Sequence, residues 1–128
     1  PGGRRSVHER LLRDWAEGRA ARLFTDEIRQ VCMADNLAAV LLELCGPAAP
    51  GGILHWAGAQ PVSRYELGRA IAARFGLDAA QLIVPVRLAG TALAAVRQAD
   101  LSLDLRPLSE ALTTTPEPLA VQLARLWR

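Results

Sequence analysis

The sequence has no lysine: all 15 of its basic residues are arginines, set against 13 carboxylates. Without a lysine amine the chain cannot form a Schiff base, nor can it build the lysine-containing P-loop that binds nucleotide phosphates. The glycine-rich pattern G-x-G-x-x-G, which places a dinucleotide pyrophosphate at a helix N-terminus, is also missing. We therefore expect no cofactor-binding residues in this chain.

Cysteine and long apolar runs are scarce as well. The two cysteines, Cys32 and Cys45, form no C-x-x-C pair and have no histidine at metal-ligand spacing. We expect no metal site, and we expect both thiols to be buried in a protein of a reducing compartment, the cytoplasm. No apolar run is long enough to span a bilayer and no signal peptide is visible, so we expect no membrane association.

The charge of the chain at first suggests a nucleic-acid partner, because the net charge is +2 and the pI is about 9.0. The arginines are, however, interspersed with carboxylates, and aromatic residues make up only 5% of the chain. Nucleic-acid binders gather their cations into a stripe with stacking aromatics. Only the segment 4–22 is locally basic, which is typical of a solvated helix face, so we expect no nucleic-acid binding.

The pattern of hydrophobic and capping residues predicts one globular domain over residues 1–128, with 51% hydrophobic and 22% charged side chains. Helices are expected over 6–21, 35–45 (capped by Asp35) and 63–75 (capped by a box of Ser63 and Glu66), and from Thr115 to Trp127. Extended segments are expected within 22–34, as one stretch or two short strands, over 82–86, over 101–105, and as a buried strand over Gly52–Gly58. This order favours an α/β fold of short strands and about four helices, attached to a sheet located elsewhere.

Two arginines stand out as candidate substrate ligands. Arg29 and Arg97 lie in mostly uncharged stretches and not on an obvious solvated helix face. A guanidinium group suits bidentate pairing with phosphate oxygens. The alternative is an ion pair with a nearby carboxylate, such as Asp26, Asp35 or Asp100.

The run Gly52–Gly58 holds two further candidates. Trp56 would stack on a base or a sugar if it lay beside a cleft, and would otherwise belong to the core. His55 has a side chain suited to proton transfer, but no serine, cysteine or carboxylate near it in sequence supports a catalytic triad. We therefore include Trp56 among the substrate-binding candidates and assign no catalytic residue.

Three segments together resemble a known family. They are Phe24–Ala38, the run Gly52-Ile-Leu-His-Trp-Ala-Gly58 followed by Ser63-Arg-Tyr-Glu-Leu67, and Arg97–Asp104. In this order they resemble the dTDP-4-dehydrorhamnose reductase group of extended short-chain dehydrogenase/reductases. The last segment is similar to that group's R-P-x-x-x-x-L-D element, with Gln98 in place of proline.

The resemblance implies that this chain is the C-terminal substrate-binding part of a nucleotide-sugar reductase whose N-terminal Rossmann core is absent. The family reduces a keto-sugar nucleotide with NADPH or NADH, using a Tyr-x-x-x-Lys pair. That pair cannot be carried over, because Tyr65 is followed by Arg69 at the lysine position. Arg29 corresponds to an arginine that faces the substrate diphosphate in some members.

The implied partners are a nucleotide-sugar and the missing Rossmann domain. Leucines that would face the Rossmann sheet also predict self-association as a homodimer. A second hypothesis is a non-catalytic regulatory or binding module of the same family. The regulatory subunit of methionine adenosyltransferase is such a case, and its G-x-x-H-W-x-G segment is similar to Gly52–Gly58. The residues of this chain leave both hypotheses open.

Overall fold

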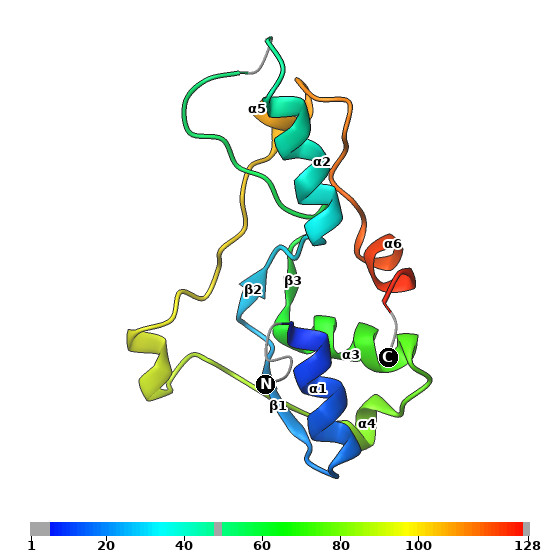
Figure 1. Ribbon diagram of the computed structural model, residues 1–128. Coiled ribbons are helices and arrows are strands. Elements are labelled where there is room, and N and C mark those ends of the chain that lie inside the picture. The colour runs from blue at the N-terminus through cyan, green and yellow to red at the C-terminus, as the bar shows by residue number, and fades with distance from the viewer. Residues whose placement is uncertain (1–5, 48–49, 127–128) are drawn as a thin grey trace, which may run out of the picture.

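The computed structural model describes residues 6–47 and 50–126. Within these ranges there are six α-helices, of which two are single turns of four residues, together with short strands (Figure 1). The elements are α1 (Val7–Ala16), β1 (Ala21–Phe24), β2 (Ile28–Arg29), α2 (Ala34–Leu44), β3 (Val62–Ser63), α3 (Arg64–Arg74), α4 (Ala79–Leu82), β4 (Ile83–Val86), the 3-10 turn η1 (Ala92–Ala95), α5 (Arg106–Ser109) and α6 (Leu119–Ala124). The predicted α/β fold is confirmed.

The strands form two separate pairs. β1 lies parallel to β4, with Ala21 opposite Ile83 and Phe24 opposite Val86. β2 lies antiparallel to β3, and Ile28 also forms an isolated bridge with Asp100. Of the two alternatives for 22–34, one stretch or two short strands, the second is confirmed, as is a strand near 82–86. The expected extended segment over 101–105 forms no strand.

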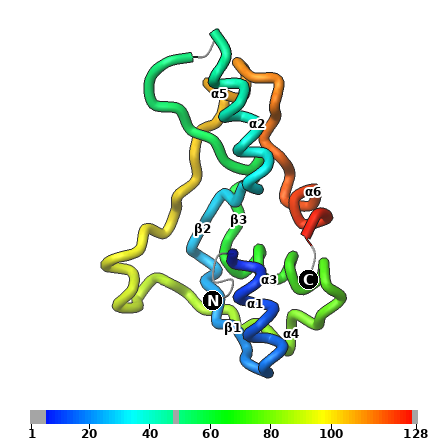
Figure 2. Tube along the Cα trace, viewed as in Figure 1, coloured from blue at the N-terminus to red at the C-terminus, as the bar shows by residue number. Residues whose placement is uncertain are grey.

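The main core lies where α1 and α3 pack against the β1–β4 pair, at the lower end of the molecule in Figures 1 and 2. Its buried side chains come from all of these elements, from helix α6 and from the residues after it: Leu11, Trp15, Leu23, Leu67, Ile71, Ala72, Ile83, Leu123 and Leu126. The indole Nε1 of Trp15 donates a 3.1 Å hydrogen bond to the carbonyl of Leu82, so its polar end is satisfied. Helices α2 and α5 lie at the other end of the molecule (Figure 1).

Two helices begin with capping boxes. In α3, Ser63 Oγ accepts a 3.0 Å hydrogen bond from the Glu66 N–H, and Glu66 accepts one of 2.8 Å from the Ser63 N–H. These hydrogen bonds hold the pKa of Glu66 below its usual value. The predicted cap at Ser63 is confirmed, and Ser6 caps α1 in the same way. Helix α1 ends at Ala16 instead of reaching residue 21, because Gly18 adopts a φ of 73° and turns the chain toward β1.

The prediction of a buried strand over Gly52–Gly58 is wrong. This segment pairs with no strand, and Ile53 is 90% exposed. Only its end, Ala57 and Gly58, is buried. A short apolar run bounded by glycines predicted a buried strand, but such a run does not show whether a neighbouring strand is there to pair with it.

The last helix and α2 also begin elsewhere than expected. Helix α6 starts at Leu119 and not at Thr115, because Pro118 disfavours helical geometry at the preceding Glu117. The predicted end of this helix at Trp127 lies outside the described residues. Helix α2 starts at Ala34 with Met33 as its N-cap, so Asp35 lies inside the first turn instead of capping it.

The cysteines differ from each other in exposure. Cys32 is half-buried and Cys45 is exposed at the end of α2, so the prediction that both are buried is wrong for Cys45. Burial raises the pKa of the Cys32 thiol. Both cysteines are free.

Candidate anion-binding site

Three arginines surround the carboxylate of Glu27, whose side chain is only 1% exposed. Arg29 Nη2 lies 2.7 Å and Arg97 Nη2 lies 3.2 Å from Glu27 Oε1. Arg64 Nε lies 3.8 Å from Oε2 on the other side of the carboxylate. We call Arg29, Arg64 and Arg97 around Glu27 the arginine cluster.

The cluster is assembled from three parts of the chain. The β2–β3 pair places Ile28 opposite Ser63, and the Arg64 N–H donates a 3.0 Å hydrogen bond to the Glu27 carbonyl. This joins the start of α3 to the residues around β2. Arg97 comes from a third segment, in which every residue from 89 to 104 is exposed; we call residues 89–104 the arm.

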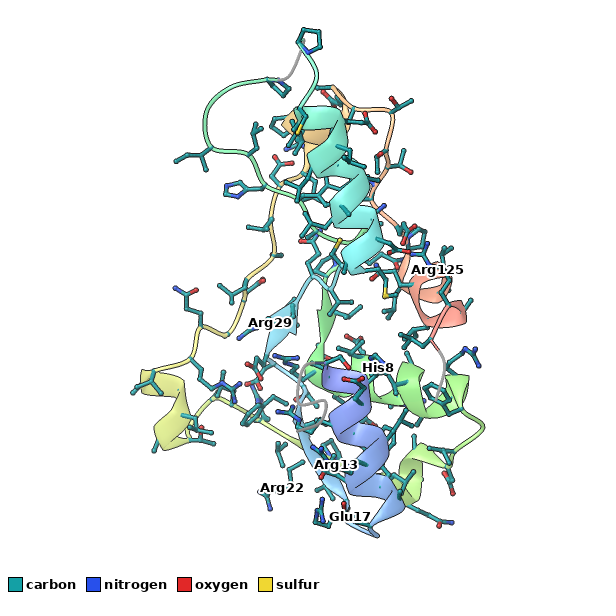
Figure 3. All side chains as sticks on the ribbon, viewed as in Figure 1. His8, Arg13, Glu17, Arg22, Arg29 and Arg125 are labelled. Carbon is teal, nitrogen blue, oxygen red and sulfur yellow. The ribbon has the colours of Figure 1, made fainter. Side chains whose placement is uncertain are left out.

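Arg29 connects β2 to the arm. Its Nη2 donates to the Gln98 carbonyl at 3.0 Å, and its Nη1 donates to the Ala99 carbonyl at 3.4 Å. The Ile28 N–H donates to the same Ala99 carbonyl at 2.6 Å. Figure 3 shows Arg29 projecting from β2 toward the side on which the arm runs. The guanidinium is therefore held by several acceptors, and its side chain is 17% exposed.

The charges of the cluster do not balance. One carboxylate faces three guanidinium groups, which leaves two positive charges in excess among these four side chains. Asp100 also interacts electrostatically with Arg29, and Arg10 with Arg64. Burial lowers the pKa of Arg64, and the neighbouring Arg29 and Arg97 lower it further, although Glu27 opposes them. Arg97 is 41% exposed, so of the three guanidinium groups it is the one most open to solvent. Such an excess of partly desolvated positive charge suits a phosphate group.

The predicted ligands Arg29 and Arg97 therefore lie together, because both contact Glu27. Glu27 is not one of the three carboxylates that the sequence suggested as their partners. Asp26 instead accepts hydrogen bonds from the Leu88 and Ala89 N–H groups at 2.6 and 3.1 Å, which hold its pKa below the usual value. Asp35 pairs with Arg125, and Asp100 accepts from the Ser102 N–H.

Sequence reasoning missed Glu27 and Arg64. A signal for Glu27 existed, because residues two apart in an extended segment point to the same face, and Glu27 stands two before Arg29. Arg64 was considered only as the first residue of a capped helix. Arg64 lies near Glu27 because β2 pairs with β3. Strands of two residues are too short to be predicted from the sequence pattern.

Trp56 has different partners. Its indole Nε1 donates a 2.9 Å hydrogen bond to Asn36 Oδ1 in α2. Among the hydrogen bonds and ion pairs of the described residues, none joins Trp56 to the arginine cluster. A stacking role for Trp56 stays a prediction.

Other kinds of site can be assessed over residues 6–47 and 50–126. In these ranges no three His, Cys, Asp or Glu side chains gather where they could hold a metal ion. None of the helices found there combines the length and the apolar character required to cross a bilayer. The arginine cluster brings together two of the residues that the sequence singles out, Arg29 and Arg97.

Residues 2–127 match the family model described as the RmlD substrate binding domain. The chain belongs to the RmlD substrate binding domain family. This confirms the resemblance to the reductase group of the extended short-chain dehydrogenase/reductases. No curated protein sequence matches the chain.

Solved structures of larger enzymes share the fold of this RmlD-type domain. One is a dTDP-glucose 4,6-dehydratase from Bacillus anthracis in complex with NAD, with a TM-score of 0.72 and 11% identity over 93% of this chain and 37% of the enzyme. Another is the dTDP-glucose 4,6-dehydratase DesIV from Streptomyces venezuelae with NAD and TYD bound, with a TM-score of 0.71 and 18% identity over 94% of this chain and 36% of the enzyme. The domain thus spans little more than a third of the length of these enzymes.

Proposed function

We propose that this RmlD-type domain binds the diphosphate of a nucleotide-sugar through Arg29 and Arg97. In this proposal it is the substrate-binding part of an NAD(P)-dependent reductase of the dTDP-4-dehydrorhamnose type and is not catalytically complete alone. The observation that carries the proposal is the excess of two positive charges around the buried Glu27. A nucleotide diphosphate ester carries two negative charges at neutral pH, and Arg97, which is 41% exposed, is placed to pair with its oxygens. Both Nη atoms of Arg29 already donate to protein acceptors, so Arg29 would contribute by its charge.

The residues of this chain do not fit a nicotinamide cofactor. None of the described strands leads into a glycine-rich turn and a helix N-terminus of the kind that holds a dinucleotide pyrophosphate. Tyr65, at the start of α3, lies beside Arg69, whose guanidinium carbon is 5.8 Å from the centre of its ring. No hydride-transfer step is therefore assigned to this chain. NADPH or NADH would be held by another part of the reductase.

Two surfaces of this domain support contact with a cofactor-binding Rossmann domain. The β1–β4 pair has two strands only, and parallel strands are normally buried within larger sheets. Helix α2 exposes Leu37 and Leu41, which share a face at i, i+4 spacing, and also Leu42. We infer that a Rossmann domain covers these surfaces. A second copy of the chain would cover them when that domain is missing.

A second candidate is a non-catalytic binding or regulatory module of the same family. The absence of lysine from these 128 residues does not separate the two candidates, because the catalytic pair of the reductases would lie ahead of this domain, and the arginine cluster serves either one. A chain that carries both a glycine-rich fingerprint and Tyr-x-x-x-Lys ahead of this domain would favour the enzyme. A degraded fingerprint would favour the module. In both cases the free cysteines support a cytoplasmic location.

The test of diphosphate binding is a calorimetric titration of the domain with dTDP-glucose, with inorganic pyrophosphate and with uncharged glucose. We expect heat of binding for the first two and none for glucose. The double variant Arg29→Gln/Arg97→Gln should lose the binding of both anions. Arg106→Gln is the matched control, because Arg106 is exposed and pairs with Asp104 outside the cluster. Binding of dTDP-glucose that survives the double variant would contradict the proposal.

A further inference from the structure

Glu27 occupies an unusual place for a carboxylate beside a site for anions. Its side chain is 1% exposed, and it repels the negative ligand that the surrounding arginines attract. An anion site built for charge alone would have no carboxylate at its centre. The contacts of Glu27 indicate what it does there.

One oxygen of Glu27 joins two arginines from different segments. Oε1 contacts Arg29 at 2.7 Å and Arg97 at 3.2 Å, while Oε2 faces Arg64 at 3.8 Å. Without this carboxylate, three like charges would repel one another and the exposed Arg97 would turn toward solvent, whereas Arg29 would keep its hydrogen bonds to backbone carbonyls. With it, the guanidinium groups stay together before a ligand arrives, so binding need not pay for ordering them.

The same carboxylate also holds the arm. The arm lies between buried Leu88 and buried Leu105, and Figures 1 and 2 show it extending away from the body of the molecule. At its start the Ala89 N–H donates to Asp26 (3.1 Å), and the Arg97 guanidinium lies over the Phe24 ring of β1. Its other contacts with the body meet the chain around β2. Among them are the pair of Arg97 with Glu27, the hydrogen bonds of Arg29 to Gln98 and Ala99, the Ile28 N–H to Ala99, the Leu101 N–H to Ile28 (3.3 Å), and the Leu103 N–H to the Gln30 side chain (2.9 Å).

We infer that Glu27 is the positioning residue of the anion site: it presets the three guanidinium groups and, through Arg97, fastens the arm to β2. The inference rests on the proposed function for its ligand and deepens it. Within the cluster Glu27 offsets one of three positive charges, and the remaining positive charge attracts an anion such as a diphosphate. The arm is the segment whose order depends on the cluster.

Whether Glu27→Gln binds an anion more tightly or more weakly distinguishes a positioning role of Glu27 from a purely repulsive one. Glu27→Gln keeps the shape of the side chain and raises the net charge of the cluster by one. If Glu27 were only an opposing charge, the variant would bind pyrophosphate more tightly. Positioning predicts the reverse, an affinity about tenfold lower, which is the effect of losing a charge-assisted hydrogen bond. Asp104→Asn is the charge-matched control, because it removes an exposed carboxylate that pairs with Arg106, and its affinity should not fall.

Hydrogen exchange gives a second readout that needs no ligand. In Glu27→Gln the N–H groups of Leu101 and Leu103 should exchange about tenfold faster than in the unmodified chain, because the arm loses its fastening. Circular dichroism at the same temperature checks that the variant is folded. If it is not, Arg97→Gln replaces it, since Arg97 is on the exposed arm and its loss should release the same two N–H groups.

The outcomes separate this inference from the proposed function. If the unmodified chain binds neither pyrophosphate nor dTDP-glucose, the proposed function fails, and the exchange rates alone decide whether Glu27 positions the cluster. If the chain binds and Glu27→Gln binds equally or more tightly, the inference is overturned while the proposed function stands. Unchanged exchange at Leu101 and Leu103 in a folded variant also overturns it. Weaker binding with faster exchange supports it.

Discussion

The indole Nε1 of Trp56 donates a 2.9 Å hydrogen bond to the Oδ1 of Asn36, a buried residue of α2. Asn36 in turn donates from Nδ2 to the carbonyl of Thr115 at 3.1 Å. One amide side chain thus joins three segments: α2, the run Gly52–Gly58 and the stretch that leads to α6. The polar groups of these irregular segments are satisfied by a side chain where no sheet is present to satisfy them.

Asn36→Ala should lower the free energy of unfolding by about 1–3 kcal/mol, because it leaves the Trp56 N–H and the Thr115 carbonyl without their partner. Chemical denaturation followed by circular dichroism measures the change. Gln98→Ala is a control, since Gln98 is exposed on the arm and its described hydrogen bond uses the backbone carbonyl. Equal stability of the two variants would show that the Asn36 bridge does not hold the three segments.

The predicted stacking role of Trp56 can be separated from its hydrogen bond. Trp56→Leu removes the ring and the N–H, whereas Asn36→Ala removes the partner of the N–H and keeps the ring. If Trp56 stacks on the base or sugar, Trp56→Leu should weaken dTDP-glucose binding about tenfold, since stacking on an aromatic contributes about 1–3 kcal/mol per base. Pyrophosphate binding should stay the same. A loss of affinity shared by both variants would instead indicate a purely structural role.

The domain alone should bind no NADH or NADPH that isothermal titration calorimetry can detect. The physical reason is the missing glycine-rich turn, which leaves no cradle of N–H groups for the cofactor pyrophosphate. dTDP-glucose serves as the positive control in the same cell. Micromolar binding of either nicotinamide would contradict the interpretation of this domain as the substrate-binding part of a larger reductase.

The sequence predicted what depends on neighbouring residues and failed where distant segments must meet. The cap at Ser63 was predictable because its partner Glu66 is three residues away, within one helical turn. The run Gly52–Gly58 was predicted as a strand, but a strand needs a partner, and no pattern within the run reports that one is lacking. The arginine cluster contains both predictable and unpredictable features. Arg29 and Arg97 were predictable as isolated cations, whereas Glu27 joins them only once the arm lies beside β2.

The position of Gly58 is also constrained by a segment that is distant in sequence. A Cβ atom at this position would overlap the carbonyl of Val31 and crowd the Gln122 side chain, which itself donates to that carbonyl at 3.1 Å. Gly58→Ala should therefore lower the free energy of unfolding by about 1–3 kcal/mol, as is usual for overpacking. Gly51→Ala is the matched control, because a Cβ there meets nothing within 4 Å. Thermal denaturation compares the two, and a neutral Gly58→Ala would show that the backbone around Val31 moves freely.

Glu43, near the end of α2, makes the stability of the domain depend on pH. Its carboxylate accepts hydrogen bonds from the Thr114 hydroxyl and N–H and from the Thr113 hydroxyl and N–H. These bonds, led by the one from the Thr114 hydroxyl, lower the pKa of Glu43 from 4.5 to about 2. A carboxyl group with a lower pKa in the folded than in the unfolded state stabilises the fold above its unfolded pKa. That contribution is lost as the pH falls through the folded value.

We therefore expect Glu43→Gln to lower the melting temperature most above pH 4.5, with the difference from the unmodified chain shrinking toward pH 2. Melting temperatures measured across this range by circular dichroism give the comparison. Thr114→Val is the companion variant, because it keeps the carboxylate and removes the hydroxyl that contributes most to the low pKa. Its melting curve should show the same convergence at low pH to a smaller degree. A difference that stays constant across the range would mean that Glu43 acts by packing and not through its charge.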